Sequence, residues 1–207
     1  MTCIVDYGVG NLSSLVGSLR HIGEQACVTA EPELLLSADR IILPGVGAFG
    51  DAAERLFSSG LAEVLHRAVE KGIPLLGICL GMQLLFERSL EYGEHRGLGL
   101  LRGEVRRIDE AGGFPYKIPH MGWNSLKITR SSPILCYVKE GDYVYYVHSF
   151  CARGVGDALC ASSEYGCEIV GAVSSGNVHG TQFHPEKSGE VGLSILRAFC
   201  EMKGGAS

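Results

Sequence analysis

Short apolar runs alternate with helix-periodic segments through the first half of the chain. Strands are expected at residues 3–5, 27–29, 41–43 and 74–78, the first, third and fourth being strongly apolar. Apolar residues recur at helical spacing over 12–22 and 61–69, each segment ending at a glycine, and a further helix follows Cys79 through Phe86. Strands that alternate with helices indicate a parallel sheet covered on both faces.

The pattern changes after about residue 103. Segments 104–108, 143–147, 169–173 and 178–183 are expected to be strands, joined by tight turns of which Ser175-Gly176-Asn177 is the clearest. A last helix is expected over 188–202, with a frayed end at 204–207. Without internal repeats or linkers, residues 1–207 are predicted to form a single three-layer α/β domain. Its central sheet is mixed but largely parallel, and helices flank it.

Composition narrows the possible functions. The 46% hydrophobic and 20% charged residues are typical of a globular protein. A net charge of −5 with no Lys/Arg run argues against nucleic-acid and membrane-surface binding. No apolar stretch reaches the ~18 residues of a membrane span, and the N-terminus lacks a signal-peptide pattern, so a cytoplasmic location is expected. The eight cysteines form no C-x-x-C pair, so neither a zinc site nor a disulfide framework is expected.

One cysteine has unusual neighbours. Gly77-Ile78-Cys79-Leu80-Gly81 places a thiol between two glycines, where a buried strand turns into a helix. Small flanking residues allow a sharp turn that exposes a nucleophile, as in the G-x-S-x-G elbow. A helix N-terminus also favours the thiolate over the thiol. For most cysteines a role as a core residue is the better interpretation, but the two glycines favour a nucleophile here.

The segment Gln182-Phe183-His184-Pro185-Glu186 contains a base and a carboxylate. Residues two apart in an extended segment share a face, and Pro185 disfavours helix at His184. A thiol nucleophile needs a base, and the base needs a group that orients it. Taken alone, a structural histidine beside a solvated glutamate is equally plausible. With the cysteine elbow, the pattern favours a Cys79–His184–Glu186 triad.

Two glycine-rich segments remain. Residues 44–50 follow a buried strand and lack the Lys-Ser/Thr of a phosphate-binding loop, which favours a backbone that directs an N–H at an oxyanion, or simply a tight turn. Asp6-Tyr7-Gly8-Val9-Gly10-Asn11 resembles the start of a dinucleotide fingerprint. Ser13 stands where the third glycine belongs, and Glu31 lies near the place of a ribose-binding acid. A non-enzymatic dinucleotide-binding module is therefore a minor alternative.

Together these motifs resemble the class I (triad) glutamine amidotransferases, and more closely the glutaminase subunits of imidazole glycerol phosphate synthase. The resemblance spans essentially the whole chain. It rests on the triad, on Pro44-Gly45-Val46-Gly47 in place of the commoner Pro-Gly-Gly, and on residues 6–12, 119–124 and 184–187. It implies hydrolysis of glutamine to glutamate and ammonia through a cysteine thioester, without cofactor or metal.

The resemblance also implies roles for individual residues. The backbone N–H groups of Val46 and Leu80 would form the oxyanion hole. The glutamine site would comprise Gly47, Gln83, Glu91, Ser149 and Phe150, the last replacing a commoner tyrosine. A (β/α)₈-barrel cyclase, which forms imidazole glycerol phosphate and aminoimidazole carboxamide ribonucleotide in histidine biosynthesis, would be the heterodimer partner. The residues of this chain that contact the cyclase would be Asn11, Trp123, Tyr145 and Lys187.

Alternatives remain for several of these assignments. A glutaminase subunit of another synthase, such as pyridoxal phosphate synthase, would share the triad but would carry Pro-Gly-Gly in the loop. A cysteine hydrolase that acts without a synthase is also compatible with the triad. Trp123 and Lys187 have ordinary structural explanations, as a packing residue and a solvated charge. His120 and His148 are expected to be structural histidines with satisfied hydrogen bonds.

Overall fold

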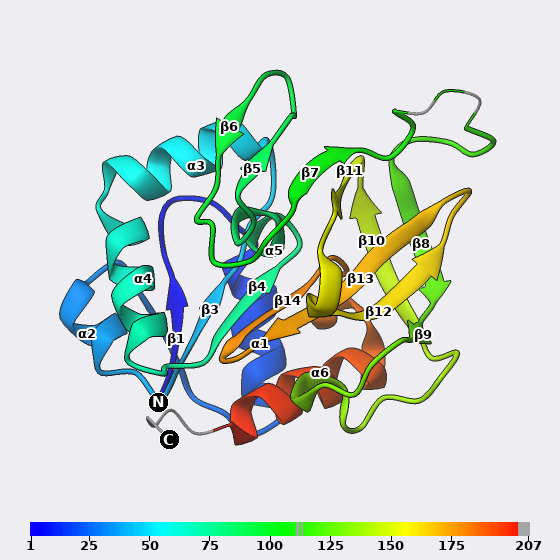
Figure 1. The fold of residues 1–207 in the computed structure, drawn as a ribbon. Coiled ribbons are helices and arrows are strands. Elements are labelled where there is room, and N and C mark those ends of the chain that lie inside the picture. The colour runs from blue at the N-terminus through cyan, green and yellow to red at the C-terminus, as the bar shows by residue number, and fades with distance from the viewer. Residues whose placement is uncertain (111, 113, 203–207) are drawn as a thin grey trace.

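The computed structural model describes residues 1–110, 112 and 114–202, and in these residues an eight-stranded sheet runs through the molecule (Figure 1). Its strand order is β2-β1-β3-β4-β14-β13-β12-β9. The first five strands in this order are parallel: β2 Ala26–Thr29, β1 Thr2–Val5, β3 Arg40–Leu43, β4 Leu75–Ile78 and β14 Val178–Thr181. The rest are antiparallel: β13 Glu168–Ser175, β12 Leu159–Glu164 and β9 Lys127–Ile128.

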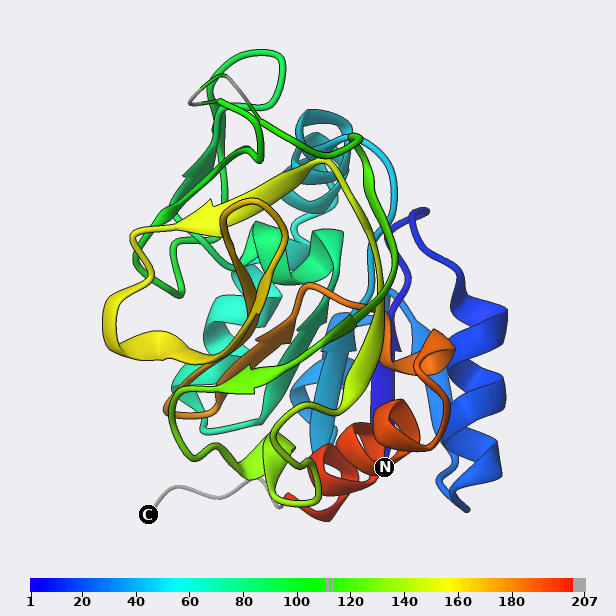
Figure 2. The same ribbon diagram turned by 90° about the vertical axis from the view of Figure 1, so that its right-hand side faces the viewer.

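Helices cover both faces of the sheet, as Figures 1 and 2 show. One face carries α2 Pro32–Leu36, α3 Phe49–Ser58, α4 Leu61–Glu70 and α5 Leu80–Leu84; the other carries α1 Leu12–His21 and α6 Gly189–Glu201. Successive strand side chains enter opposite cores: Ile41 and Leu43 pack with α2–α5, and Ile42 packs with α1 and α6. This confirms the predicted α/β domain with a mixed central sheet.

Besides the large sheet, the described residues form two smaller sheets. One pairs β8 His120–Ser125 with β10 Tyr143–His148; the other has the order β11-β7-β5-β6, from Phe150–Arg153, Glu104–Arg107, Arg88–Ser89 and His95–Arg96. Short 3₁₀ turns lie at Pro133–Leu135, Gly156–Ala158 and Pro185–Lys187. Of these additions, β7 and β10 were predicted from the sequence.

The structure corrects several predicted boundaries. The predicted loop 44–50 is shorter, because α3 already begins at Phe49. Gly50 therefore lies in a helix, where its missing side chain makes room for the His95 ring; a Cβ there would lie 2.7 Å from that ring. The predicted strand 178–183 ends at Thr181. The turn at 175–177 is confirmed, with Gly176 at φ +56°. The predicted frayed end at 204–207 lies outside the described residues.

Within the described ranges, no helix is long and apolar enough to cross a membrane. All eight cysteines are free thiols in the structure.

The junction between β4 and α5 is tightly packed at two glycines. A Cβ on Gly77 would lie 2.6 Å from the Gly81 carbonyl oxygen, and a Cβ on Gly81 would overlap the Leu43 carbonyl oxygen. Real Cβ atoms do not approach backbone atoms so closely, and neither backbone segment is free to move because both belong to the central layers. The two glycines therefore let α5 begin directly against β3 and β4.

Gly81→Ala is expected to lower the free energy of unfolding by about 3 kcal/mol or more, because the added methyl meets rigid backbone. Gly17→Ala is the matched control, since Gly17 lies in α1 with no atom within 4 Å of its virtual Cβ. It is expected to raise the free energy of unfolding by about 0.5–1 kcal/mol through helix propensity. Chemical denaturation measures both. Equal, small effects would show that the β4–α5 junction tolerates a side chain.

Candidate active site

Cys79 occupies the turn that joins β4 to α5. Its backbone has φ +54° and ψ −109°, a region that a non-glycine residue rarely adopts and that costs about 1–3 kcal/mol. The Cys79 N–H donates to the Thr181 carbonyl of the neighbouring strand β14 at 2.7 Å, which fixes the turn from the side. Cys79 is the N-cap of α5, as the sequence predicted, so the sulfur lies at a helix N-terminus.

His184 and Glu186 lie just beyond the end of β14, the strand that pairs with β4. Their side chains are 3% and 5% exposed, and Nδ1 of His184 lies 2.8 Å from Oε1 of Glu186. The predicted extended geometry is only half correct. His184 is extended, whereas residues Pro185–Lys187 form a 3₁₀ turn, because a proline suits the first position of a helical turn. The turn still brings the two side chains together.

Electrostatics favour a proton on His184. Burial by itself lowers the pKa of this imidazole, but the hydrogen-bonding influence and negative charge of Cys79 and Glu186 outweigh burial and raise the pKa to about 9. The Cys79 sulfur thus helps to raise the pKa of the imidazole. Among the described residues, however, His184 Nε2 has no partner in hydrogen-bond geometry. Nδ1 is held by Glu186, and Nε2 is left to exchange a proton with the thiol or with a bound molecule.

A cavity of about 430 Å³ opens in front of Cys79 and His184. Every glutamine-site residue predicted from the sequence lines it: Gly47, Gln83, Glu91, Ser149 and Phe150. Val46 and Leu80, the predicted oxyanion-hole residues, line it as well. The volume is in the range of small-molecule sites in proteins. The structure therefore assembles these residues, which lie far apart in the sequence, around one space.

Glu91 is the one carboxylate in the wall of this cavity within the described part of the chain. Its Oε2 accepts the Phe49 N–H at 2.8 Å, and its own N–H donates to Ser89 Oγ at 3.1 Å. Burial raises the pKa of Glu91, although the Phe49 N–H opposes this effect. A cationic group in the cavity would offset the cost of burying this charge.

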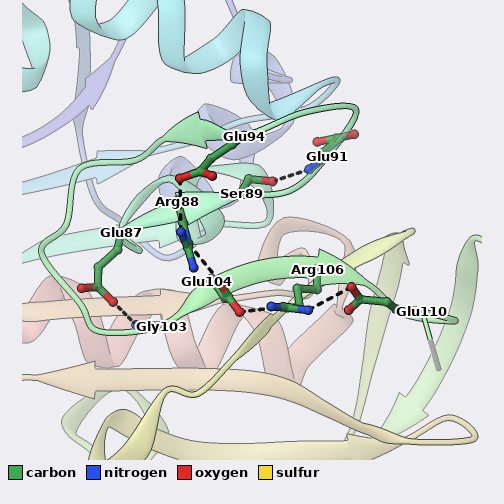
Figure 3. A network of polar contacts seen from close by, with 9 residues as sticks. All are labelled: Glu87, Arg88, Ser89, Glu91, Glu94, Gly103, Glu104, Arg106 and Glu110. Carbon is green, nitrogen blue, oxygen red and sulfur yellow. Dashed lines mark hydrogen bonds and ion pairs between the residues drawn. The ribbon is translucent and has the colours of Figure 1, made fainter.

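A surface network of ion pairs connects strands β5 and β7 near Glu91 (Figure 3). Arg88 on β5 contacts Glu94 and Glu104, and Glu104 in turn contacts Arg106 at 2.6 Å. Exposed pairs of this kind contribute little individually, about 0–1 kcal/mol. As a network they align β5 with β7 and so fix the segment that carries Ser89 and Glu91.

The loop over the cavity, residues 44–48, is held at its start and free at its centre. The Tyr7 hydroxyl donates to the Pro44 carbonyl at 2.7 Å, and Gly45 packs against Leu80 and Gly81 so closely that no Cβ fits. Val46 and Gly47 are exposed, and Gly47 has φ +99°, which favours glycine. The part that borders the cavity is thus the part with fewest constraints.

The four predicted partner-contact residues lie on the surface near this site. Trp123 on β8 is 56% exposed and meets Tyr145 on β10 edge to face, with ring centroids 6.0 Å apart. Lys187 and Asn11 are also exposed, and Asn11 lines a small cavity with His184 and Glu186. Met121 and Tyr143, which the sequence analysis did not single out, are exposed beside Trp123.

The sequence analysis missed several residues in the cavity wall or next to Cys79. Gln182 Nε2 lies 3.7 Å from the Cys79 sulfur, and its Oε1 accepts from Gln83 at 3.0 Å. Tyr92, 84% exposed with φ +52°, lies at the rim, and His148 is in the wall. Gln182 could have been found from the sequence by its position two residues before His184. Among the described residues, no three His, Cys, Asp or Glu side chains are grouped to hold a metal.

The charge of His184 gives a test in solution. Because its pKa is raised above the ordinary 6.5, its contribution to stability is complete below that pH and is lost as the pH rises through about 9. Cys79→Ala and Glu186→Gln should each lower the pKa of His184, because each removes a partner that favours the imidazolium. NMR titration of the imidazole measures this. An ordinary pKa in the wild type, unchanged in both variants, would contradict the coupling.

Comparisons with known proteins show the family of the chain. The family described as Glutamine amidotransferase class-I matches residues 3–202. The chain is 52% identical over 205 residues to imidazole glycerol phosphate synthase subunit HisH of Wolinella succinogenes, covering 98% of this chain and 100% of the relative. It is 50% identical over 199 residues to the subunit of the same name from Bacillus cytotoxicus, covering 96% and 93%.

Solved structures agree in fold. A crystal structure of a glutamine amidotransferase superimposes with a TM-score of 0.76 at 21% identity and covers 97% of both chains. The structure of PurLQS from Thermotoga maritima gives a TM-score of 0.73 at 23% identity, covering 96% of both chains. The fold, the match over residues 3–202 and the near-complete coverage of relatives at about half identity lead to one conclusion: the chain belongs to the class-I glutamine amidotransferase family, and within it to the imidazole glycerol phosphate synthase subunit HisH family.

Proposed function

We propose that the protein is the glutaminase subunit of an imidazole glycerol phosphate synthase, which releases ammonia from glutamine for a partner cyclase. The observation that carries the proposal is the juxtaposition of Cys79, in a strained turn at a helix N-terminus, with the buried His184–Glu186 pair in one cavity. The relatives at 50–52% identity, named as subunits of that synthase, support the choice of partner reaction. Such a biosynthetic role implies a cytoplasmic location.

In the proposed mechanism the Cys79 thiolate attacks the side-chain amide carbon of glutamine. His184 holds the thiol proton at Nε2, and Glu186 holds the imidazole at Nδ1 in the orientation that this transfer needs. The C–N bond then breaks as His184 returns the proton to the leaving nitrogen, so ammonia departs and a glutamyl thioester remains. Water, deprotonated by His184, hydrolyses the thioester to glutamate and restores the thiol.

The cavity supplies the other requirements of this chemistry. The N–H groups of Val46 and Leu80 are assigned to the oxyanion, because both residues border the cavity beside Cys79 and Leu80 opens helix α5. Glu91 is assigned to the α-ammonium group of glutamine, which would neutralise its buried charge. Gly47, Gln83, Ser149 and Phe150 complete the wall around the substrate. Neither cofactor nor metal enters these steps.

The partner is assigned to the exposed face of the β8–β10 sheet. In register, Tyr145 faces Trp123, and the exposed side chains on this face are mostly aromatic or apolar: Met121, Trp123, Tyr143 and, half-buried, Tyr145. Grouped aromatic residues with an apolar neighbour are typical of protein interfaces. Lys187 and Asn11 would extend the contact along the edge of the site. A (β/α)₈-barrel cyclase, docked here, would receive ammonia and form imidazole glycerol phosphate and aminoimidazole carboxamide ribonucleotide.

Other amidotransferase partners are less well supported. A pyridoxal phosphate synthase subunit would share the triad, but the relatives found at near-full coverage are named for imidazole glycerol phosphate synthase. The dinucleotide-binding alternative leaves the Cys79 site unexplained.

Replacing the proposed triad residues should remove glutamine-dependent turnover in a graded order. Cys79→Ser and His184→Asn are expected to lower kcat of the assembled complex by about 10⁴-fold or more, because the nucleophile or its proton acceptor is lost. Glu186→Gln should cost less, because the imidazole still adopts a working orientation part of the time. Glutamate release, measured by a coupled assay, gives kcat.

Synthesis driven by added ammonium salt is the control, and it should survive in all three variants because the cyclase reaction then bypasses this subunit. The assignment is wrong if Cys79→Ser retains near-normal glutaminase turnover.

The isolated subunit is expected to be a poor glutaminase that the nucleotide-loaded partner activates. A glycine at position 47 allows the loop more than one backbone conformation, so that an oxyanion N–H can rest misdirected. One misdirected donor costs about 10²–10³-fold in rate. Glutamine hydrolysis is compared for the isolated chain, the complex, and the complex with nucleotide ligand. Trp123→Ala should weaken this activation, while Tyr137→Ala, an exposed tyrosine that bonds Glu201 on α6, should not. Equal rates in all three states would refute gating by the partner.

A further inference from the structure

A line of side-chain hydrogen bonds crosses the inner face of the β8–β10 sheet. Asn124 Nδ2 lies 3.3 Å from His120 Nε2, His120 Nδ1 lies 3.0 Å from His148 Nε2, and His148 Nδ1 lies 2.8 Å from the Phe150 carbonyl oxygen. His120 and His148 are directly opposite each other in the register of the two strands. We call Asn124, His120, His148 and the Phe150 carbonyl the histidine line.

The partners at both ends allow a single arrangement of protons. Asn124 Oδ1 accepts the Ser125 N–H at 2.8 Å, so its Nδ2 group is the donor toward His120. At the other end the Phe150 carbonyl can only accept, so His148 carries its proton on Nδ1. His148 Nε2 is therefore an acceptor and His120 donates from Nδ1. Every bond in the line then runs in the same direction, from Asn124 to Phe150.

Both imidazoles are kept neutral, which this arrangement requires. Burial lowers the pKa of His120 to about 4; it also lowers the pKa of His148, to about 3, although the Phe150 carbonyl opposes the effect there. His120 is stacked between the rings of Tyr146 and Tyr165, with centroid distances of 4.6 Å and 4.0 Å. A protonated imidazole at either position would lose an acceptor, so the directed line would break.

The line ends in the wall of the proposed glutamine site. His148, Ser149 and Phe150 all border the cavity. The Phe150 carbonyl accepts a second bond, from Gln83 Nε2 at 3.0 Å, and Gln83 also donates to Gln182, whose Nε2 lies 3.7 Å from the Cys79 sulfur. The backbone of residues 148–150 is thus held from both sides, by His148 and by Gln83.

The line begins on the strand that carries the proposed partner face. Trp123 lies on the exposed side of β8, and its neighbour Asn124 lies on the inner side. Asn124 also donates to the Glu164 carbonyl at 2.9 Å, so it is bonded to the last residue of strand β12 in the large sheet. A shift of β8 against β10 would change the distance from His120 to His148, because that hydrogen bond joins the two strands.

We propose that His148 is a positioning residue for glutamine, and that the histidine line makes the position of the Ser149–Phe150 wall depend on strand β8. The proposal rests on the proposed function, because Ser149 and Phe150 hold the substrate there. It adds a route from the partner face to the substrate wall that is separate from the oxyanion loop. The physical requirement is a coupling free energy between Asn124 and His148.

A double-mutant cycle on the assembled complex measures this coupling. Asn124→Leu removes the first donor at similar volume. His148→Asn keeps a donor for the Phe150 carbonyl but loses the acceptor for His120. Each change is expected to raise KM for glutamine by about fivefold, with kcat within about twofold of the wild type, because each breaks one hydrogen bond of the histidine line that positions the wall. The double variant should be no worse than His148→Asn alone.

Tyr146→Phe is the matched control. It removes a buried hydroxyl bond to Ser163 on the same face but leaves the histidine line intact, so KM should not change. The proposal would be overturned if the two increases in KM multiplied in the double variant, or if Tyr146→Phe raised KM equally. Nitrogen-15 NMR of the wild-type protein provides a test independent of any variant: both imidazoles should carry the proton on Nδ1, and an Nε2–H form of either one would contradict the line.

Failure of the inference is distinguishable from failure of the proposed function. A wild-type complex that does not hydrolyse glutamine would contradict the proposed function and, with it, the positioning role. A wild-type complex that hydrolyses glutamine, with both single variants unchanged in KM, would contradict the positioning role alone.

Discussion

The close packing of β4, α5 and β3 at Gly77 and Gly81 is the constraint on which the candidate site depends. Because neither glycine has room for a Cβ, α5 begins directly at the end of β4, and Cys79 must adopt a positive φ between them. Such strain persists only where the surroundings hold it, here through the Thr181 carbonyl and the helix that follows. The strained turn lowers stability, but it places the Cys79 thiol at a helix N-terminus, where it borders the cavity.

The parallel pairing of β4 with β14 then determines what lies beside that thiol. Ile78 is in register with Thr181, so the residues that follow each strand emerge together at the same edge of the sheet. This edge is the usual place for ligand sites in α/β proteins. His184 and Glu186 enter it as a buried pair, and the shared charge of the imidazole and its two partners explains why its pKa is raised despite burial. The proposed chemistry follows from that charge distribution.

The sequence predicted the parts of the fold that have a period, and the parts of the site that have a local signature. The strands at 3–5, 41–43 and 74–78, the helices at 12–22 and 61–69, and the position of Cys79 at a strand–helix junction agree with the structure. Strands β5 and β6 were missed, because two residues show no periodicity. The bond from Gln83 to Gln182 joins residues 99 positions apart, and the histidine line needs the register of two strands. Neither the Gln83–Gln182 bond nor the histidine line leaves a pattern along the chain.

The central claim is that Cys79 forms a covalent intermediate, with His184 as its proton acceptor and donor. It is tested most directly by quenching the nucleotide-loaded complex with acid during turnover of glutamine and examining its peptides by mass spectrometry. The account predicts a glutamyl adduct on the Cys79 peptide, no adduct on the peptides of the other seven cysteines, and no accumulation in His184→Asn. Full turnover with Cys79 unmodified, or with the adduct on another residue, would contradict it.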